Sequence, residues 1–277
     1  MKKVLTSVLA LLMAAMMVLT FAACGGNDEP ETTTEAPVAE STEAVDATEA
    51  PSEVESTEAA SEAESTEAAE VVVPTAKADI VALYNEATAK AKSAKPGFKK
   101  TVTTALNDLK MGALASIDLV RETVGDFLGE GTETVTVAKG KASDAILKST
   151  LTTADVTSAT CKLSADGKYY EVTIDVKAEK NPLKNKSALN KFTNDYKDIN
   201  EMRAGLEEAG AAVETIDIQV KTATIKAKIA VDNKALNAVD YTISSDAYLT
   251  NVKYLIAKVK VVTGNIYTTV KYTGFAY

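Results

Sequence analysis

The sequence predicts an α+β fold, a curved, meander-rich antiparallel β-sheet with helices packed on one face, preceded by a disordered tether. Three observations predict it. In the last third of the chain, apolar and polar residues alternate with the period of strands joined by short turns. Earlier segments carry apolar residues every three or four positions, which is typical of helices. Before Thr75 lies an acidic stretch with too few apolar residues to form a core.

Charge and composition divide the 277 residues into three parts, 1–23, 24–75 and 76–277. The whole chain carries −9, but 15 of its 39 acidic residues lie between Asp28 and Glu70. After Thr75 there remain 24 acidic residues against 28 Lys and Arg, so the last part carries about +4. The acidity therefore belongs to the tether, and a mildly basic domain follows it.

The first part has the order of a secretory signal: two lysines, an apolar run from Val4 to Phe21, and then small residues. Phe21-Ala22-Ala23-Cys24 resembles the lipobox of bacterial lipoproteins, and the Gly25-Gly26 that follows is common in Gram-positive ones. The resemblance covers about the first 26 residues, and Phe21 stands where leucine is commonest.

The resemblance implies that residues 1–23 are a lipoprotein signal peptide and that diacylglycerol is attached to Cys24. The protein would then be extracytoplasmic, anchored to the outer face of the cell membrane. The alternative is an uncleaved transmembrane helix, because the apolar run is close to the ~20 residues needed to span a bilayer.

The predicted tether, residues 24–75, repeats Ser-Thr-Glu-Ala at Ser41, Ser56 and Ser65. From Asp28 to Glu70 it contains no Lys, Arg or aromatic residue. Ordering such a segment costs conformational entropy without burying apolar surface, so we expect it to be disordered. It would hold the domain away from the bilayer.

In the first half of the domain, residues 76–277, the pattern predicts a helix from Asp79 to Ala94, with Asp79 as its N-cap. Its apolar face would contain Ile80, Leu83, Tyr84, Ala87 and Ala91. The elements expected next are a strand from Lys100 to Leu109, a helix from Gly112 to Leu128, a strand from Thr134 to Ala138 and a helical turn from Ser143 to Ser149.

A hairpin is predicted most clearly around Asp166-Gly167, with apolar alternation from Ala159 to Leu163 and from Tyr170 to Val176. Helical spacing returns between Leu189 and Leu206 and ends at Gly210. The strands expected after it contain Ile216 to Val220, Ala223 to Val231, Val239 to Ile243, Val252 to Val262 and Ile266 to Tyr277.

The residue types exclude several chemistries. The chain has no histidine, which removes the usual general base, the Ser-His and Cys-His dyads and the commonest zinc ligand. Cys161 shares a strand face with Ala159 and Leu163, so we expect it to be a buried apolar residue and not a nucleophile. No Walker loop, Gly-x-Ser-x-Gly elbow or EF-hand spacing is present. We therefore predict no catalytic, cofactor-binding or metal site.

Two weaker candidates remain open. Asp195, Asp198 and Glu201 are spaced by three on the predicted middle helix, where they would hold a cation or, more simply, form a solvated face. Nine of the ten tyrosines lie at or after Tyr169, where they would line a groove for sugar or lipid or serve only as core and strand residues. We expect a mostly closed core, with any binding in a surface groove between the middle helices and the last strands.

Together these patterns favour a membrane-anchored cell-surface lipoprotein that displays a non-catalytic binding domain. Its partner would be an apolar small molecule, an anionic wall polymer or another protein, and no nucleic acid is expected. The alternative is an extracytoplasmic hydrolase that uses paired carboxylates. A curved sheet with helices on its inner side also looks like lipoprotein-carrier half-barrels, an analogy of fold only.

Overall fold

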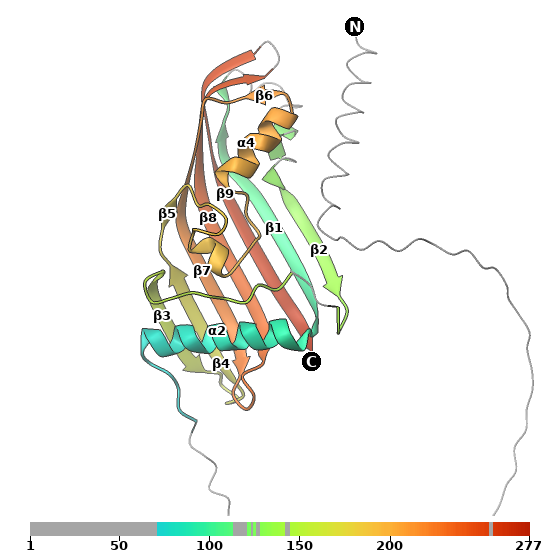
Figure 1. Ribbon diagram of the computed structural model, residues 1–277, viewed down its shortest axis with the longest axis vertical. Coiled ribbons are helices and arrows are strands. Elements are labelled where there is room, and N and C mark those ends of the chain that lie inside the picture. The colour runs from blue at the N-terminus through green and yellow to red at the C-terminus, as the bar shows by residue number, and fades with distance from the viewer. Residues whose placement is uncertain (1–70, 113–120, 123, 126–127, 142–144, 255–256) are drawn as a thin grey trace, which may run out of the picture. The chain divides into compact units, whose positions relative to one another are not determined.

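Nine antiparallel strands form one sheet in the part of the chain that the computed structural model describes, residues 71–112, 121–122, 124–125, 128–141, 145–254 and 257–277. Their order is β2-β1-β9-β8-β7-β4-β3, with β5 paired to β7 and β6 to β8. Helices α2 and α4 lie on one face of the sheet (Figure 1), so the predicted α+β class is confirmed.

The strands are β1 Gly97–Lys110, β2 Gly131–Val137, β3 Val156–Leu163, β4 Tyr169–Val176, β5 Glu179–Lys180, β6 Ala211–Ala212, β7 Thr215–Ala230, β8 Leu236–Tyr254 and β9 Ala257–Ala276. The predicted hairpin is confirmed as β3 and β4, and the predicted strands at 100–109 and 134–138 are confirmed as β1 and β2. All belong to a compact unit, Glu70–Tyr277.

Helix α2, Lys77–Ala94, covers one end of the sheet (Figure 1). Its predicted apolar face is confirmed, because all five residues named for it are buried. The predicted N-cap is wrong: the cap position is Ala76, and Asp79 lies in the first turn, where its charge suits the positive end of the helix dipole. The helix ends at Lys95, which adopts φ 51°.

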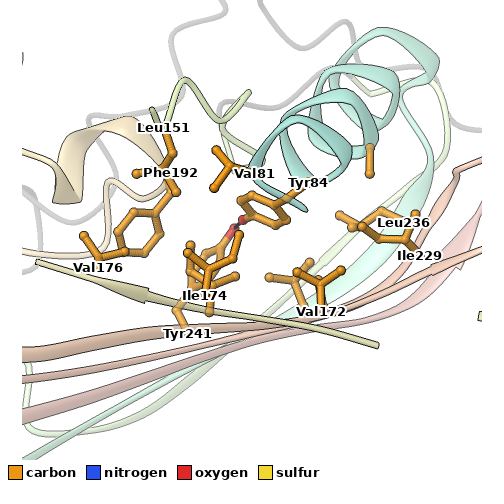
Figure 2. Packing of buried hydrophobic residues seen from close by; sticks show 14 of the residues in the cluster. Val81, Tyr84, Leu151, Val172, Ile174, Val176, Phe192, Ile229, Leu236 and Tyr241 are labelled. Atoms are coloured by element: carbon orange, nitrogen blue, oxygen red, sulfur yellow. Dashed lines mark hydrogen bonds between the residues drawn. The ribbon is translucent and has the colours of Figure 1, made fainter. Parts of the chain in front are cut away.

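The main core lies between α2 and strands β4, β7 and β8. Figure 2 shows Tyr84 of α2 reaching down to Tyr241 of β8, among branched aliphatic side chains from the sheet such as Ile174. The two phenol oxygens are 2.9 Å apart and share a hydrogen bond. This pair satisfies two buried hydroxyls and joins elements 157 residues apart in the chain.

Strand β7 corrects the two separate alternations expected before and after Lys221. It is one strand of 16 residues with a bulge between Val220 and Thr222, where the pairing with β8 shifts by one residue. Before the bulge the inward residues are Ile216, Ile218 and Val220. The extra residue shifts the alternation by one position, so the inward residues after the bulge begin with Ala223. A bulge, and not a turn, therefore explains the change of phase.

The strand expected from Val252 to Val262 is also wrong. Strand β8 continues to Tyr254 and β9 begins at Ala257, and these two residues pair with each other. The separate strand expected from Ile266 is therefore the second half of β9. Two long strands replace three shorter ones.

The expected continuous middle helix is divided into two short elements. A single 3-10 turn, Leu189–Lys191, is followed by irregular chain, and α4 then spans Ile199–Glu208. Asp198 has extended backbone and caps α4, which breaks the helical spacing read from the sequence. Asp195 precedes the helix and does not belong to it.

Several predicted features fall on residues outside those described. These are the signal peptide, Cys24 and the tether as far as residue 70, most of the predicted helix 112–128, and the first part of the predicted turn 143–149, whose described remainder is not helical. The end of the tether is described from Val71. The carbonyl of Val72 accepts a hydrogen bond from the Tyr170 hydroxyl at 3.3 Å, so contacts with the folded unit begin before Ala76.

Candidate functional site

An apolar cavity of about 90 Å³ lies between α4 and the strands at the end of the sheet away from α2. Its walls expose no polar surface. The lining comes from α4, from five strands and from the segment that contains Val124 and Leu128, and it includes Met202, Leu206, Leu106, Ile216, Ala247 and Val262. We expected any binding to occur between the middle helices and the last strands, and the cavity lies there.

The apolar residues around the cavity do not belong to the main core. Two small apolar clusters lie apart from the main core: one contains Met111 and Val262, and the other contains Met202 and Ala247. The cavity separates them and is lined by members of both. Small residues such as Ala247 and Gly264 face the space, and no side chain of the described residues fills it. The main core under α2 is closed, as expected.

Helix α4 is held over the cavity by polar contacts at its start and in its middle. At its start, the Asp198 carboxylate accepts from the backbone N–H groups of Asn200 and Glu201, and the Glu201 carboxylate accepts from the Asp198 N–H. From the middle of the helix, Arg203 donates to the carbonyl of Val213 at 2.9 Å. These contacts fix the helix while its apolar face looks onto the cavity.

The three acids considered as a cation site are not brought together as one. Asp198 and Glu201 form the capping box of α4, and Glu201 also pairs with Lys184 at 2.5 Å. Asp195 instead pairs with Lys100 of β1 at 2.5 Å. Among the described residues, no group of three or more Cys, Asp or Glu side chains is placed to hold a metal ion.

The capping box gives a testable pH dependence. Burial alone would raise the pKa of Asp198, but backbone N–H groups of Glu201, Lys184 and Asn200 donate to the carboxylate and lower its pKa on balance. Its contribution to stability is therefore present above the unfolded pKa of about 3.9 and is lost as the pH falls through the lower folded value.

We expect Asp198→Ala to lower the free energy of unfolding by about 1 kcal/mol at pH 7, because α4 loses its N-cap. In urea denaturation the difference from wild type should shrink as the pH approaches about 2. Asp198→Asn is the matched control, since Asn caps equally well without titrating. An equal loss in both variants at pH 7 would contradict the capping role.

Asp195 belongs to a polar cluster that the sequence analysis missed. Its carboxylate pairs with Lys100, and both side chains are about 15% exposed. The Tyr272 hydroxyl lies 3.5 Å from the other carboxylate oxygen and donates to the Ala145 carbonyl at 2.7 Å. Lys100 also lies 5.5 Å from the centre of the Tyr272 ring. The cluster joins the loop before α4 to β1 and β9.

The tyrosines of this region cannot act as bases at neutral pH. Burial, together with the Asp195 charge, raises the pKa of Tyr272 far above its usual range. Burial likewise raises the pKa of Tyr84 and of Tyr241. All three phenols stay protonated and serve as hydrogen-bonding groups. The sequence gives no signal for these contacts, because the paired residues are distant in the chain: Tyr272 and Asp195 are 77 residues apart, and Tyr84 and Tyr241 are 157 apart.

Cys161 lies on the core-facing side of β3 and packs against the main core. The sequence predicts a buried residue here, but Cys161 is only half-buried, because β3 lies at the edge of the sheet. Burial raises the pKa of its thiol, which lowers the fraction of reactive thiolate. This placement agrees with an apolar side chain and gives no activated nucleophile.

A second hollow, of about 480 Å³, lies between the β3–β4 and β7–β8 turns and the end of β9. Its polar groups are used by the turns themselves. The Tyr277 hydroxyl bonds to both backbone groups of Leu236, and the Asn233 side chain accepts from the Ala235 N–H. These bonds stabilise the turns, so the hollow gives weaker support for a ligand than the cavity.

Comparison of the chain with protein-family models, with curated proteins and with solved structures gave no match. Within the described residues, neither α2 nor α4 is long and apolar enough to cross a membrane.

Proposed function

We propose that the protein is a membrane-anchored cell-surface lipoprotein whose folded domain is a non-catalytic module that binds an apolar ligand. The observation that carries the ligand class is the cavity between α4 and the sheet, whose walls expose no polar surface. A buried polar or charged ligand group would lose its hydration there and find no hydrogen-bonding partner on the walls.

The size of the cavity limits the kinds of ligand that fit it. About 90 Å³ is well below the 300–1,000 Å³ of a typical drug-sized site. An empty apolar cavity of about 150 Å³ binds benzene in another protein, so small apolar groups do occupy such spaces. The end of an aliphatic chain fits this space, with the rest of the ligand leaving past α4.

An anionic polymer is less well supported as the partner. Lys162 and Lys228 both pair with Glu171 on the outer sheet face, and Lys221 pairs with Asp246. Two acids therefore offset part of the charge of these three lysines, while the net charge of the domain stays about +4. No observation favours the alternative of a carboxylate-dependent hydrolase, because the acids considered for it are engaged in ion pairs and a helix cap.

The proposed ligand is tested with cis-parinaric acid, a fatty acid that becomes fluorescent in apolar surroundings. Wild type should bind it, and Ala247→Leu should raise the Kd at least about tenfold, because the larger side chain fills the cavity. Ala212→Leu, at an exposed position of β6, is the matched control and should bind as wild type does. No binding by wild type, or equal binding by all three proteins, would contradict the proposal.

The proposed anchor has a separate test. In bacteria grown with radiolabelled palmitate, the full-length chain should carry label and Cys24→Ala should carry none. Cys161→Ala is the control, because it removes the other cysteine and should leave the label unchanged. Label that persists in Cys24→Ala would show that the lipobox interpretation is wrong.

A further inference from the structure

The outer face of the sheet, opposite α2 and α4, carries an unusual group of exposed apolar side chains on β8 and β9. Tyr248, Val261 and Tyr267 are 43%, 51% and 41% exposed. The strand register places all three on the same face, because Val261 pairs with the outward Thr250 and Tyr267 with the outward Ser244. Most other outward positions of these strands are polar.

The two tyrosines are separated along the strands by a fixed distance. Tyr248 pairs with Thr263, four residues before Tyr267 on the neighbouring strand. At about 3.3 Å per residue this offset is ~13 Å, and one strand spacing of ~4.8 Å is added sideways. The two tyrosine Cα positions therefore lie apart on a continuous sheet surface with polar residues between them, and the Tyr248 side chain reaches toward these residues, because its hydroxyl donates to Asp246 at 3.4 Å.

That polar strip is already ordered. Asp246 of β8 pairs with Asn265 of β9 in the register, and the Asn265 amide donates to the Asp246 carboxylate and to the Ser244 hydroxyl, each at 3.2 Å. Lys221, the bulge residue of β7, binds the other Asp246 oxygen at 2.8 Å. Donors and acceptors are thus held in place, and the acid and the lysine offset each other's charge.

We propose that this surface, the Tyr248–Tyr267 platform, binds an uncharged polysaccharide in an extended conformation. A pyranose ring has an apolar C–H face that stacks on an aromatic ring and a rim of hydroxyls that need hydrogen-bonding partners. The two tyrosines supply the stacking surface. Asp246 and Asn265 mostly bond to each other and to their neighbours, so the Ser244 hydroxyl, which accepts from Asn265, is the group left to donate to a sugar.

The geometry favours an extended chain over a short or globular ligand. The backbone offset of ~13 Å between the two tyrosines is longer than one sugar ring, so a chain of sugars contacts both side chains more readily than a single sugar does. A stable protein–protein interface buries about 800 Å² on each partner around an apolar centre, whereas this platform has polar groups at its centre. Near-neutral charge disfavours a strongly anionic polymer. The platform lies on the face opposite the cavity and does not depend on the ligand proposed there.

The test is co-sedimentation of the purified full-length protein, in detergent, with insoluble cellulose and chitin. Wild type should sediment with at least one of them, and the matching soluble hexasaccharide should release it. The double variant Tyr248→Ala/Tyr267→Ala should bind at least about tenfold more weakly. Tyr248→Phe/Tyr267→Phe, which keeps both rings, should stay close to wild type.

Thermal unfolding serves as the control for folding, because both side chains are exposed and their truncation should change the midpoint little. Absence of wild-type sedimentation with both polysaccharides would overturn the proposal. So would binding by the double alanine variant that equals wild type, since the tyrosines would then be only strand-forming surface residues.

Discussion

Lys100→Met should lower the free energy of unfolding by about 3 kcal/mol, because it leaves the Asp195 carboxylate largely buried without its cation. The pair is only about 15% exposed, so little water can replace the lysine. The nearby Tyr272 hydroxyl already donates to the Ala145 carbonyl and cannot compensate fully. Urea denaturation of the compact unit measures the change.

The matched control for Lys100→Met is Lys162→Met, whose ion pair with Glu171 is largely exposed and should contribute at most about 1 kcal/mol. The double variant Lys100→Met/Asp195→Leu should recover part of the loss, because no unpaired charge remains. Equal, small effects of Lys100→Met and Lys162→Met would show that the Asp195 cluster does not stabilise the fold.

Phe192→Ala should destabilise the fold by about 3–5 kcal/mol, since it removes a large side chain from a closed part of the core. Phe192 is 1% exposed, and its ring packs edge-on against Tyr241 with the centroids 5.2 Å apart. The residue also holds the chain after the 3-10 turn against the sheet. Its loss should therefore affect the segment that leads to α4.

The control for Phe192→Ala is Phe275→Ala, near the end of β9, where the ring is only partly buried and the loss should be smaller. Both variants are compared by urea denaturation, and the dependence on urea should have an unchanged slope. A loss below about 1 kcal/mol for Phe192→Ala would mean that the core under α2 can close around the missing ring.

Local patterns predicted the sheet well. The β3–β4 hairpin was predicted because Asp166-Gly167 is a strong turn signal between two alternating segments, and Gly167 adopts φ 71° there. The apolar face of α2 was also predicted, because its spacing is regular and Lys95-Pro96-Gly97 ends it. Such features depend on neighbouring residues alone.

Features that depend on distant residues were missed. The two halves of β7 were predicted as separate strands, because a bulge and a turn both shift the alternation of apolar and polar residues by one position. The boundary between β8 and β9 was missed because the sequence between Tyr254 and Ala257 contains no Gly, Pro, Asn or Asp. The three-residue spacing of Asp195 and Asp198 is also typical of a helix. Only the fold shows that Asp195 pairs with Lys100 and that Asp198 caps α4.

The candidate site was predicted in position but not in kind. The sequence predicts a surface groove between the middle helices and the last strands, whereas the structure has a partly open apolar cavity of about 90 Å³ there. Small inward residues such as Ala247 are compatible with close packing or with a cavity. Which of the two occurs depends on how closely α4 approaches the sheet, and the sequence does not encode that distance locally.

Native mass spectrometry of the protein, purified without added lipid, tests the proposed cavity ligand most directly. Wild type should carry a co-purifying apolar molecule, seen as an added mass that organic solvent removes. Ala247→Leu should carry little of it, and Ala212→Leu should carry as much as wild type. A wild-type protein that shows only its own mass, or an adduct equally present in Ala247→Leu, would contradict the account.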